Sequence, residues 1–225
     1  ASGLRLLKPE EYDPLHASSL GTGELVKLAL DKGVNKIILC IGGSATVDGA
    51  TGILRALGIR FSDADGNELN NLPEKLIELD AIDVSGMDKR VMNCQLIILC
   101  DVENVLLGKD GSANIFGPQK GASLSDIIKL EEGLTKLRDI VFKQTGIDMA
   151  LLKHGGAAGG IAASLAVLFN AKLVNGIEEF LLITQFEKAL DKADLVITGE
   201  GSIDLQTLQG KGPFGVAKMA GKKGI

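Results

Sequence analysis

Aromatic side chains are scarce in this sequence, which has no tryptophan, one tyrosine and seven phenylalanines among 225 residues. A surface that binds nucleic acid by stacking bases needs several exposed aromatic rings. The formal net charge of −5 also gives no basic surface for a phosphate backbone. Both features argue against a nucleic-acid partner.

Cysteine is rare as well, and Cys40, Cys94 and Cys100 form no CxxC pair. The usual spacing of zinc sites and redox motifs is therefore missing. Cys40 and Cys100 each end an apolar run, so we expect buried thiols in a reducing compartment. No apolar run approaches the roughly 20 residues of a membrane span, and no signal peptide is visible. We expect a cytoplasmic protein with no membrane partner.

Apolar residues and glycines are plentiful, with 45% hydrophobic residues and 29 glycines. Apolar runs predict buried strands at residues 36–41, 95–100 and 194–198, and a short strand at 59–61. Helical spacing predicts helices at residues 21–33, 49–57, 125–144, 161–169 and 177–191, and Ser125 is the expected N-cap of the third. This alternation indicates an α/β protein with a mainly parallel sheet and flanking helices.

Each of the three buried strands runs directly into a glycine-rich or acidic loop. These loops cover residues 42–49, 101–104 and 199–204. In open α/β sheets, ligands bind beyond the carboxyl ends of the strands. We therefore expect the three loops to converge on one site.

The first loop has the chemistry of an anion cradle. Gly42 and Gly43 let the backbone approach a ligand closely, and Ser44 and Thr46 add hydroxyl donors. The start of the following helix is expected to supply N–H groups and a positive dipole. The alternative interpretation is a tight strand-to-helix turn in which Asp48 caps the helix.

Carboxylates follow the other two strands. Asp101 is placed to hold Mg²⁺ or a substrate hydroxyl, or else to cap a turn. Glu200 and Asp204 are four residues apart, so they suit a shared Mg²⁺ or proton abstraction from an attacking hydroxyl. Lys211 suits neutralisation of phosphate charge. A solvated polar loop is the alternative for this third segment.

A further glycine run, residues 155–160, precedes the apolar helix at 161–169. It suits a second anion site, a close helix contact or a hinge. His154, next to this run, has no Ser/His/Asp pattern around it, so we expect a structural role for it.

Seven motifs occur in the order found in bacterial class I glycerate kinases. They are GTGE (21–24), IGGSATVDGATG (41–52), ALG (56–58), CDVEN (100–104), FGPQKGA (116–122), GAAGG (156–160) and TGEGSIDLQTLQGKGPFGVA (198–217). The sequence therefore resembles this family, of the glycerate 2-kinase type, over nearly its whole length. It departs from the family pattern at Ala50, where a second glycine usually follows Asp-Gly, and at Val105, where proline is usual.

The resemblance implies an enzyme that uses ATP and Mg²⁺ to phosphorylate D-glycerate, with 2-phosphoglycerate the favoured product. It also implies an incomplete chain that lacks N- and C-terminal segments. Residues 1–20 would be a remnant of a Rossmann-like first domain, 21–195 an inserted α/β domain, and 196–225 a segment returning to the first domain.

Residue types and resemblance together give a set of candidate site residues. The catalytic candidates are Asp204, which we favour as the base, with Glu200 and Lys211. The metal candidates are Asp101 and Glu200. The candidates for binding substrate or phosphate are Gly42, Gly43, Ser44, Thr46, Asp48, Gly159, Gly160, Gly199 and Gly201.

Two other functions fit the sequence less well. A non-catalytic α/β domain that binds a nucleotide or a small organic acid is the main alternative. A nicotinamide-dependent dehydrogenase is disfavoured because no GxGxxG follows a predicted strand.

Overall fold

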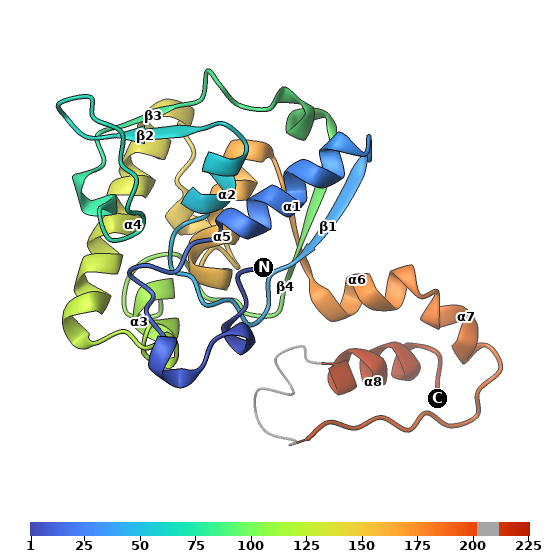
Figure 1. Ribbon diagram of the computed structural model, residues 1–225. Helices are drawn as coiled ribbons and strands as arrows, with labels where there is room; N and C mark the ends of the chain where they lie inside the picture. Colours follow the sequence, from blue (N-terminus) through green and yellow to red (C-terminus); the bar gives the residue numbers. More distant parts are fainter. Residues whose placement is uncertain (202–211) are drawn as a thin grey trace. The chain divides into compact units, whose positions relative to one another are not determined.

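The computed structural model describes residues 1–201 and 212–225 and shows a mixed α/β fold (Figure 1). The chain divides into two compact units, Ala1–Leu173 and Val174–Ile225. The domain limits expected from the family resemblance refer to a longer protein, and they stay a prediction. No helix in the described ranges is long and apolar enough to cross a membrane.

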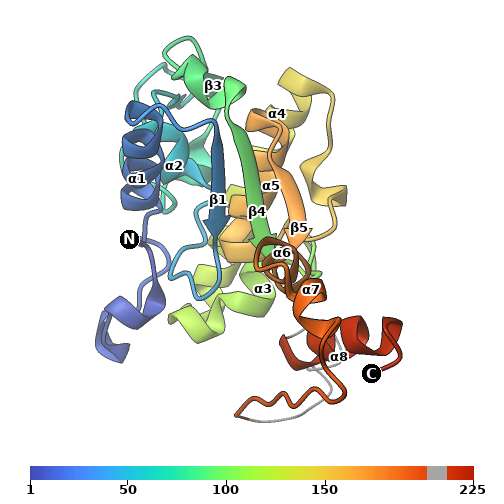
Figure 2. The same cartoon turned by 90° about the vertical axis from the view of Figure 1, so that its right-hand side faces the viewer.

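A three-stranded sheet is ordered β1 (Lys36–Cys40), β4 (Gln95–Cys100) and β5 (Lys172–Asn175), as Figure 2 shows. β1 and β4 are parallel, with Lys36 opposite Gln95 and Cys40 opposite Leu99. A separate antiparallel pair joins β2 (Arg60–Ser62) to β3 (Ala81–Asp83). The predicted strands at 36–41, 59–61 and 95–100 are thus confirmed, whereas β3 and β5 were not predicted.

Only one face of β1 packs against the core. Ile37 and Leu39 contact the core, while Ile38 is 36% exposed and Cys40 is also exposed. The expectation of a buried Cys40 thiol is wrong, because alternate residues of a strand point to opposite faces. Cys100 is buried as expected, and burial raises the pKa of its thiol to about 12.

The helices of the first unit lie beside and behind the strands in Figure 2. They are α1 (Leu20–Asp31), α2 (Thr51–Ala56), α3 (Ser112–Phe116), α4 (Leu124–Thr145) and α5 (Ala157–Phe169). Short 3₁₀ helices precede α1 or lie in the segments between the later elements, at Leu4–Leu6, Pro9–Glu11, Leu76–Glu78, Lys89–Asn93, Pro118–Lys120 and Met149–Leu151. The predicted helices at 21–33, 49–57, 125–144 and 161–169 are confirmed, with small shifts at their ends.

Helix α4 buries the stripe that the sequence predicts, formed by Leu130, Leu134, Leu137 and Val141. Its N-cap is Ser123, so the expectation of Ser125 is wrong. The hydroxyl of Ser123 accepts from the N–H of Asp126, and the carboxylate of Asp126 accepts from the N–H of Ser123. This reciprocal capping box satisfies two backbone donors, which fixes the start of the helix at Leu124.

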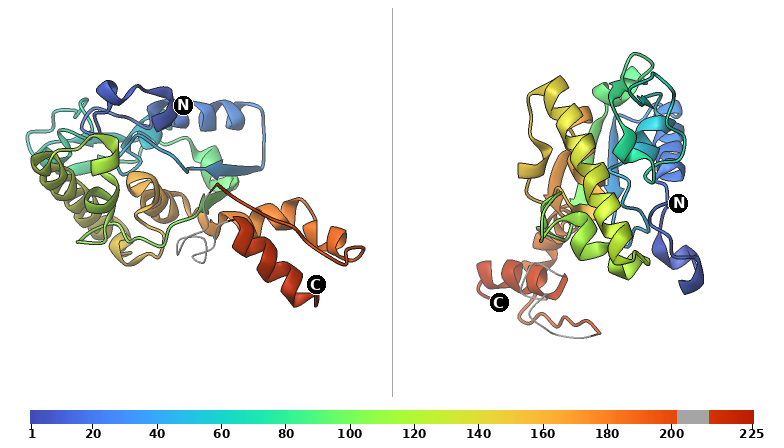
Figure 3. Two further views of the ribbon diagram at one scale, coloured as in Figure 1. Left: turned by 90° about the horizontal axis from the view of Figure 1, so that it is seen from below. Right: turned by 90° about the vertical axis from the view of Figure 1, so that its left-hand side faces the viewer.

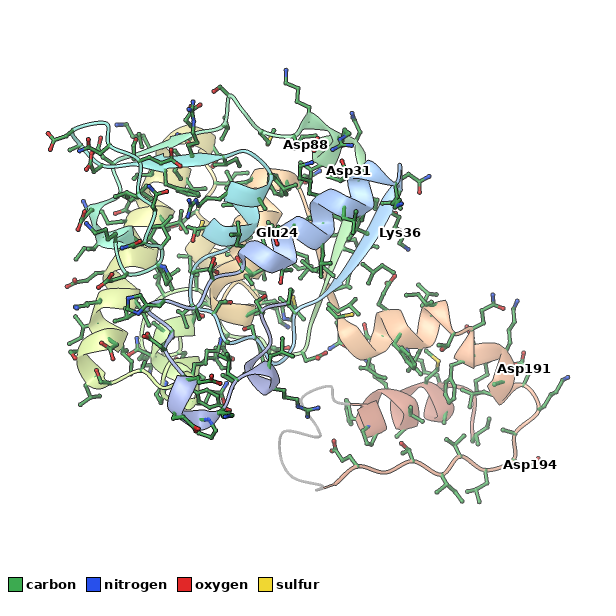
Figure 4. All side chains as sticks on the ribbon, in the orientation of Figure 1. Glu24, Asp31, Lys36, Asp88, Asp191 and Asp194 are labelled. Carbon is green, nitrogen blue, oxygen red and sulfur yellow. The ribbon has the colours of Figure 1, made fainter. Side chains whose placement is uncertain are left out.

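An exposed ion-pair cluster lies at the end of α1. Arg90 donates to Asp31 at 2.7 Å and to Asp88 at 2.6 Å; both aspartates are labelled in Figure 4. Hydrogen bonds from Arg90 lower the pKa of both carboxyl groups. Because Arg90 and Asp31 are exposed and Asp88 is partly exposed, water screens the pairs and their contribution to stability is small.

The second unit contains α6 (Gly176–Ile183), α7 (Phe186–Leu190) and α8 (Gly212–Lys222), and α8 lies beside α6 (Figure 3). A Cβ on Gly215 of α8 would lie 2.6 Å from Ile177 of α6, so the two helices pack closely. The single helix predicted for 177–191 is wrong, because Gln185 has a φ of 53° and separates α6 from α7.

The strand predicted for residues 194–198 is also wrong. This segment, which begins at Asp194 (labelled in Figure 4), has no regular secondary structure. Leu195 is 74% exposed and Ile197 is 88% exposed. A β-forming run becomes a strand only when its backbone forms hydrogen bonds with a neighbouring strand. None of the described residues pairs with residues 194–198 in this way.

Candidate functional site

A cavity of about 350 Å³ lies at the carboxyl ends of β1 and β4. Gly42, Gly43 and Ser44 follow β1 and line it, and Asp101 lines it after β4. Since the two strands are parallel neighbours, their following loops meet at one edge of the sheet. The predicted convergence of the first two loops is confirmed.

Several cavity residues were missed by sequence reasoning, since they come from segments far away in the chain. They are Leu4 and Arg5 near the N-terminus, Phe116, Gln119 and Lys120 around the 3₁₀ helix at 118–120, and Ala157 and Ala158 at the start of α5. Two motifs in the sequence pointed to some of these residues: FGPQKGA (116–122) contains Phe116, Gln119 and Lys120, and GAAGG (156–160) contains Ala157 and Ala158.

The N-terminal residues hold the loop after β1, residues 42–49, in place; we call it the glycine loop. The N–H of Leu4 donates to the carbonyl of Gly43 at 2.8 Å, and the N–H of Ala45 donates to the carbonyl of Ser2 at 2.9 Å. Gly43 has a φ of 70°, which favours glycine. A Cβ on Gly42 or Gly43 would meet no atom within 4 Å, so the loop presents bare backbone to open space.

Asp48 lies behind this loop and is completely buried. Its carboxylate accepts from the N–H and hydroxyl of Ser19 at 2.8 and 2.7 Å, and from the N–H groups of Ala50 and Gly52 at 3.2 Å each. Burial is the largest influence on this carboxyl and raises its pKa, although all four hydrogen bonds oppose the shift. The alternative interpretation of Asp48 as the N-cap is wrong, because Ala50 is the N-cap of α2, although the Asp48 carboxylate accepts from the N–H of Gly52 in the first turn.

The start of α2 is therefore not an open anion site. The N–H of Thr51 donates to the carbonyl of Asp48, the N–H of Gly52 to its carboxylate, and the N–H of Ile53 to the hydroxyl of Ser19. The expectation that this helix start receives a phosphate is wrong, because its N–H groups are already paired inside the protein. A positive charge for the cavity must come from elsewhere.

Thr46 is 1% exposed, and its hydroxyl has no hydrogen-bond partner among the described residues. It does not line the cavity, in contrast to Ser44. Its role in binding phosphate stays a prediction, as does that of Asp48.

The glycines of α5 pack against the glycine loop. Gly159 and Gly160 have φ values of 75° and 88°. A Cβ on Gly159 would lie 2.1 Å from the carbonyl oxygen of Thr46, and one on Gly160 would lie 2.7 Å from Leu106. The structure thus gives these glycines the close-contact role that the sequence left open, while their contact with a ligand stays a prediction.

The loop after β4 is held by two contacts. Nδ1 of His154 lies 2.6 Å from the carbonyl oxygen of Val102, and Lys153 forms an ion pair with Glu103 at 2.7 Å. These contacts agree with a structural role for His154. Asp101, next to them, is exposed to the cavity. Among the described residues no three His, Cys, Asp or Glu side chains gather as metal ligands.

The third predicted loop is only partly described. Gly199, Glu200 and Gly201 belong to the second unit and are exposed. Asp204 and Lys211 lie outside the described residues. The catalytic assignments of Glu200, Asp204 and Lys211, and the convergence of this loop on the cavity, stay predictions.

Comparisons with known proteins agree on one family. Residues 1–225 match the Glycerate kinase family. The chain is 45% identical over 225 residues to a glycerate kinase of Halalkalibacterium halodurans, and 44% identical over 222 residues to the glycerate 2-kinase of Escherichia coli. These alignments cover 100% and 99% of this chain but only 59% and 58% of the relatives.

A solved structure gives the same result. The crystal structure of a protein assigned as glycerate kinase 2 from Salmonella typhimurium LT2 superimposes with a TM-score of 0.89 at 47% identity. The match covers 99% of this chain and 59% of that chain. The chain therefore belongs to the glycerate kinase family.

Proposed function

We propose that this chain carries the substrate cavity of an enzyme that phosphorylates D-glycerate with ATP. The glycine loop beside the cavity is the observation that carries the proposal, because Gly42 and Gly43 leave backbone exposed to open space. Membership of the glycerate kinase family supports the reaction. The name of the Escherichia coli relative, a glycerate 2-kinase, supports 2-phosphoglycerate as the product.

Phosphoryl transfer requires aligned reactants and neutralised phosphate charge more than covalent chemistry from the protein. Gly42, Gly43 and Ser44 would hold an anionic group of a substrate at the end of β1. Asp101 fits one ligand of Mg²⁺, since this ion is bound in such sites by one or two carboxylates together with phosphates and water. When bound, Mg²⁺ would neutralise charge on the phosphates.

The remaining chemical roles fall to the third loop. We assign proton abstraction from the glycerate hydroxyl to Asp204, a metal contact to Glu200 and phosphate neutralisation to Lys211. A positioned general base contributes about 10²- to 10⁴-fold to the rate. Gly199 and Gly201 would let the backbone approach the same group. The reaction would take place in the cytoplasm, where thiols such as those of Cys40 and Cys94 remain reduced.

A chimera tests this proposal directly. The chain replaces its matching segment in the Escherichia coli glycerate 2-kinase, and phosphorus NMR follows D-glycerate, ATP and Mg²⁺ and identifies the phosphorylated hydroxyl. We expect turnover to 2-phosphoglycerate. The Gly42→Val variant should lose this turnover, because the valine side chain would occupy the open space beside the loop. The φ of Gly42 is not positive, so the substitution should not strain the backbone. Lys109→Met, an exposed change, is the control.

A folded chimera without turnover, or one whose turnover is undiminished by Gly42→Val, would contradict the proposal. Binding of ATP or glycerate without turnover would instead support the alternative of a non-catalytic binding domain.

A further inference from the structure

Lys120 is a buried lysine in the wall of the cavity. It ends the 3₁₀ helix Pro118–Lys120 and is 3% exposed. Its Nζ donates to Oγ of Ser44 at 3.0 Å and to the carbonyl oxygen of Thr46 at 2.8 Å, and it lies 6.0 Å from the centre of the Phe116 ring. Lys120 therefore joins the FGPQKGA segment to the glycine loop.

Both hydrogen-bond acceptors of this ammonium are electrically neutral. Among residues 1–201 and 212–225, no carboxylate forms an ion pair with it. A buried charge without a counter-charge is costly. Accordingly, burial lowers the pKa of Lys120 to about 8, and only Asp48 opposes this shift.

The other charged and titratable groups nearby do not neutralise Lys120. The carboxylate of Asp48 is committed to Ser19, Ala50 and Gly52. Arg5, Asp101 and Cys100 line the same cavity but form no hydrogen bond or ion pair with the ammonium. An ammonium has three N–H donors, and the two contacts to Ser44 and Thr46 leave the third without a partner among the described residues.

We propose that Lys120 supplies the positive charge of an oxyanion site in this cavity, where its third N–H donates to a carboxylate or phosphate oxygen held beside Gly42 and Gly43. The α2 start cannot supply this charge, because its N–H groups are already paired. Ser44 joins the site, since its oxygen accepts from Lys120 and its own O–H is left to donate to the ligand. The inference rests on the proposed function for the nature of the anion.

An oxyanion next to an ammonium favours its charged form and raises its pKa. At pH 8, near the pKa of Lys120, about half of the molecules carry a neutral amine, so anion binding takes up roughly half a proton. At pH 6 the amine is fully protonated, and uptake falls to zero. A lysine that only braces the loop would produce no such uptake.

The experiment is titration calorimetry of the 225-residue chain with D-glycerate and, separately, with ADP, at pH 8 in two buffers of different ionisation enthalpy. The probe that binds with proton uptake identifies the source of the oxyanion, carboxylate or phosphate. We expect Lys120→Met to weaken that binding by about 10-fold or more, as for a lost charged hydrogen bond, and to abolish the uptake. Ser44→Ala should weaken binding but retain the uptake.

Lys109→Met, at an exposed lysine, is the matched control and should bind like the wild type. Unchanged affinity and uptake in folded Lys120→Met, or binding of neither probe by the wild-type chain, would overturn the inference. If Lys120→Met does not fold, the wild-type chain still tests the inference. Equal proton uptake on D-glycerate binding at pH 6 and at pH 8 would also overturn it. If the chain binds a probe with proton uptake but the chimera has no turnover, the oxyanion site is supported and the kinase proposal is rejected.

Discussion

Asp48 offers the sharpest test of how the glycine loop is built. Its carboxylate accepts four hydrogen bonds, from two donors of Ser19 and from the N–H groups of Ala50 and Gly52. Asp48 and Ser19 are both 0% exposed, so water cannot replace a lost acceptor without entering the core. Each buried donor left unpaired costs about 1–3 kcal/mol, and the four costs are not additive because the groups are neighbours.

We expect Asp48→Ala to lower the free energy of unfolding by about 3–5 kcal/mol, since it leaves four buried donors without their acceptor, one of them the N–H of Gly52 in the first turn of α2. Asp48→Asn keeps one acceptor oxygen but places an amide among donors, and it should fall between Asp48→Ala and the wild type. Urea denaturation followed by far-ultraviolet circular dichroism measures these differences.

Asp63→Ala is the matched control. Asp63 also accepts from backbone N–H groups, those of Asp65 and Asn67 at 3.0 and 2.8 Å, but at an exposed turn. Water replaces its hydrogen bonds, so its loss should cost less than about 1 kcal/mol. A cost for Asp48→Ala as small as for Asp63→Ala would refute the structural role, and lost ligand binding in that stable variant would assign Asp48 to the substrate.

Three further predictions concern stability. Because the pKa of Lys120 is about 8 in the folded chain against 10.5 for an unperturbed lysine, the folded state binds fewer protons between these values and stability rises with pH. From pH 8 to pH 10 the wild type should gain about 2 kcal/mol relative to Lys120→Met in urea titrations, and equal slopes would disprove the buried charge. Gly159→Ala should destabilise the chain by about 3 kcal/mol or prevent folding, as its φ is 75° and its Cβ would lie 2.1 Å from the carbonyl oxygen of Thr46; a normal melting temperature would show that this contact relaxes. Leu134→Ala, at a side chain that is 0% exposed, should cost about 2–5 kcal/mol, whereas Leu124→Ala, at a side chain that is 83% exposed, should cost little; similar losses would place Leu134 outside the core.

Local sequence patterns predicted the elements whose partners lie within the described chain. The α4 stripe of Leu130 and Leu134 and the apolar run of β4 both found a core to pack against. The run at 194–198 has the same β-forming character but no strand beside it, and Leu195 and Ile197 are exposed. Apolar periodicity shows which side chains of a segment must be buried. Which elements bury them, or pair with a strand, is set by the whole fold.

Local sequence patterns predicted even less of the candidate site than of the fold. Gly42 and Asp101 were predictable, since each follows a strand and parallel strands bring their ends together. Lys120 was not, because its burial depends on a contact with Ser44, 76 residues away in the chain. Most lysines in proteins are exposed, and no local sequence pattern marks a lysine that becomes buried in the wall of a cavity.

The IGGSATVDGATG segment thus combines two physical functions in adjacent residues. Gly42, Gly43 and Ser44 face the cavity, whereas Thr46 and Asp48 are buried behind it. The buried part fixes the backbone that the exposed part presents, and a loop held in this way loses little conformational entropy when a ligand binds. Its charge comes from a separate segment, so neither motif forms an oxyanion site alone. The physical unit of the site is therefore the contact of Lys120 with this loop, which exists only after the chain has folded.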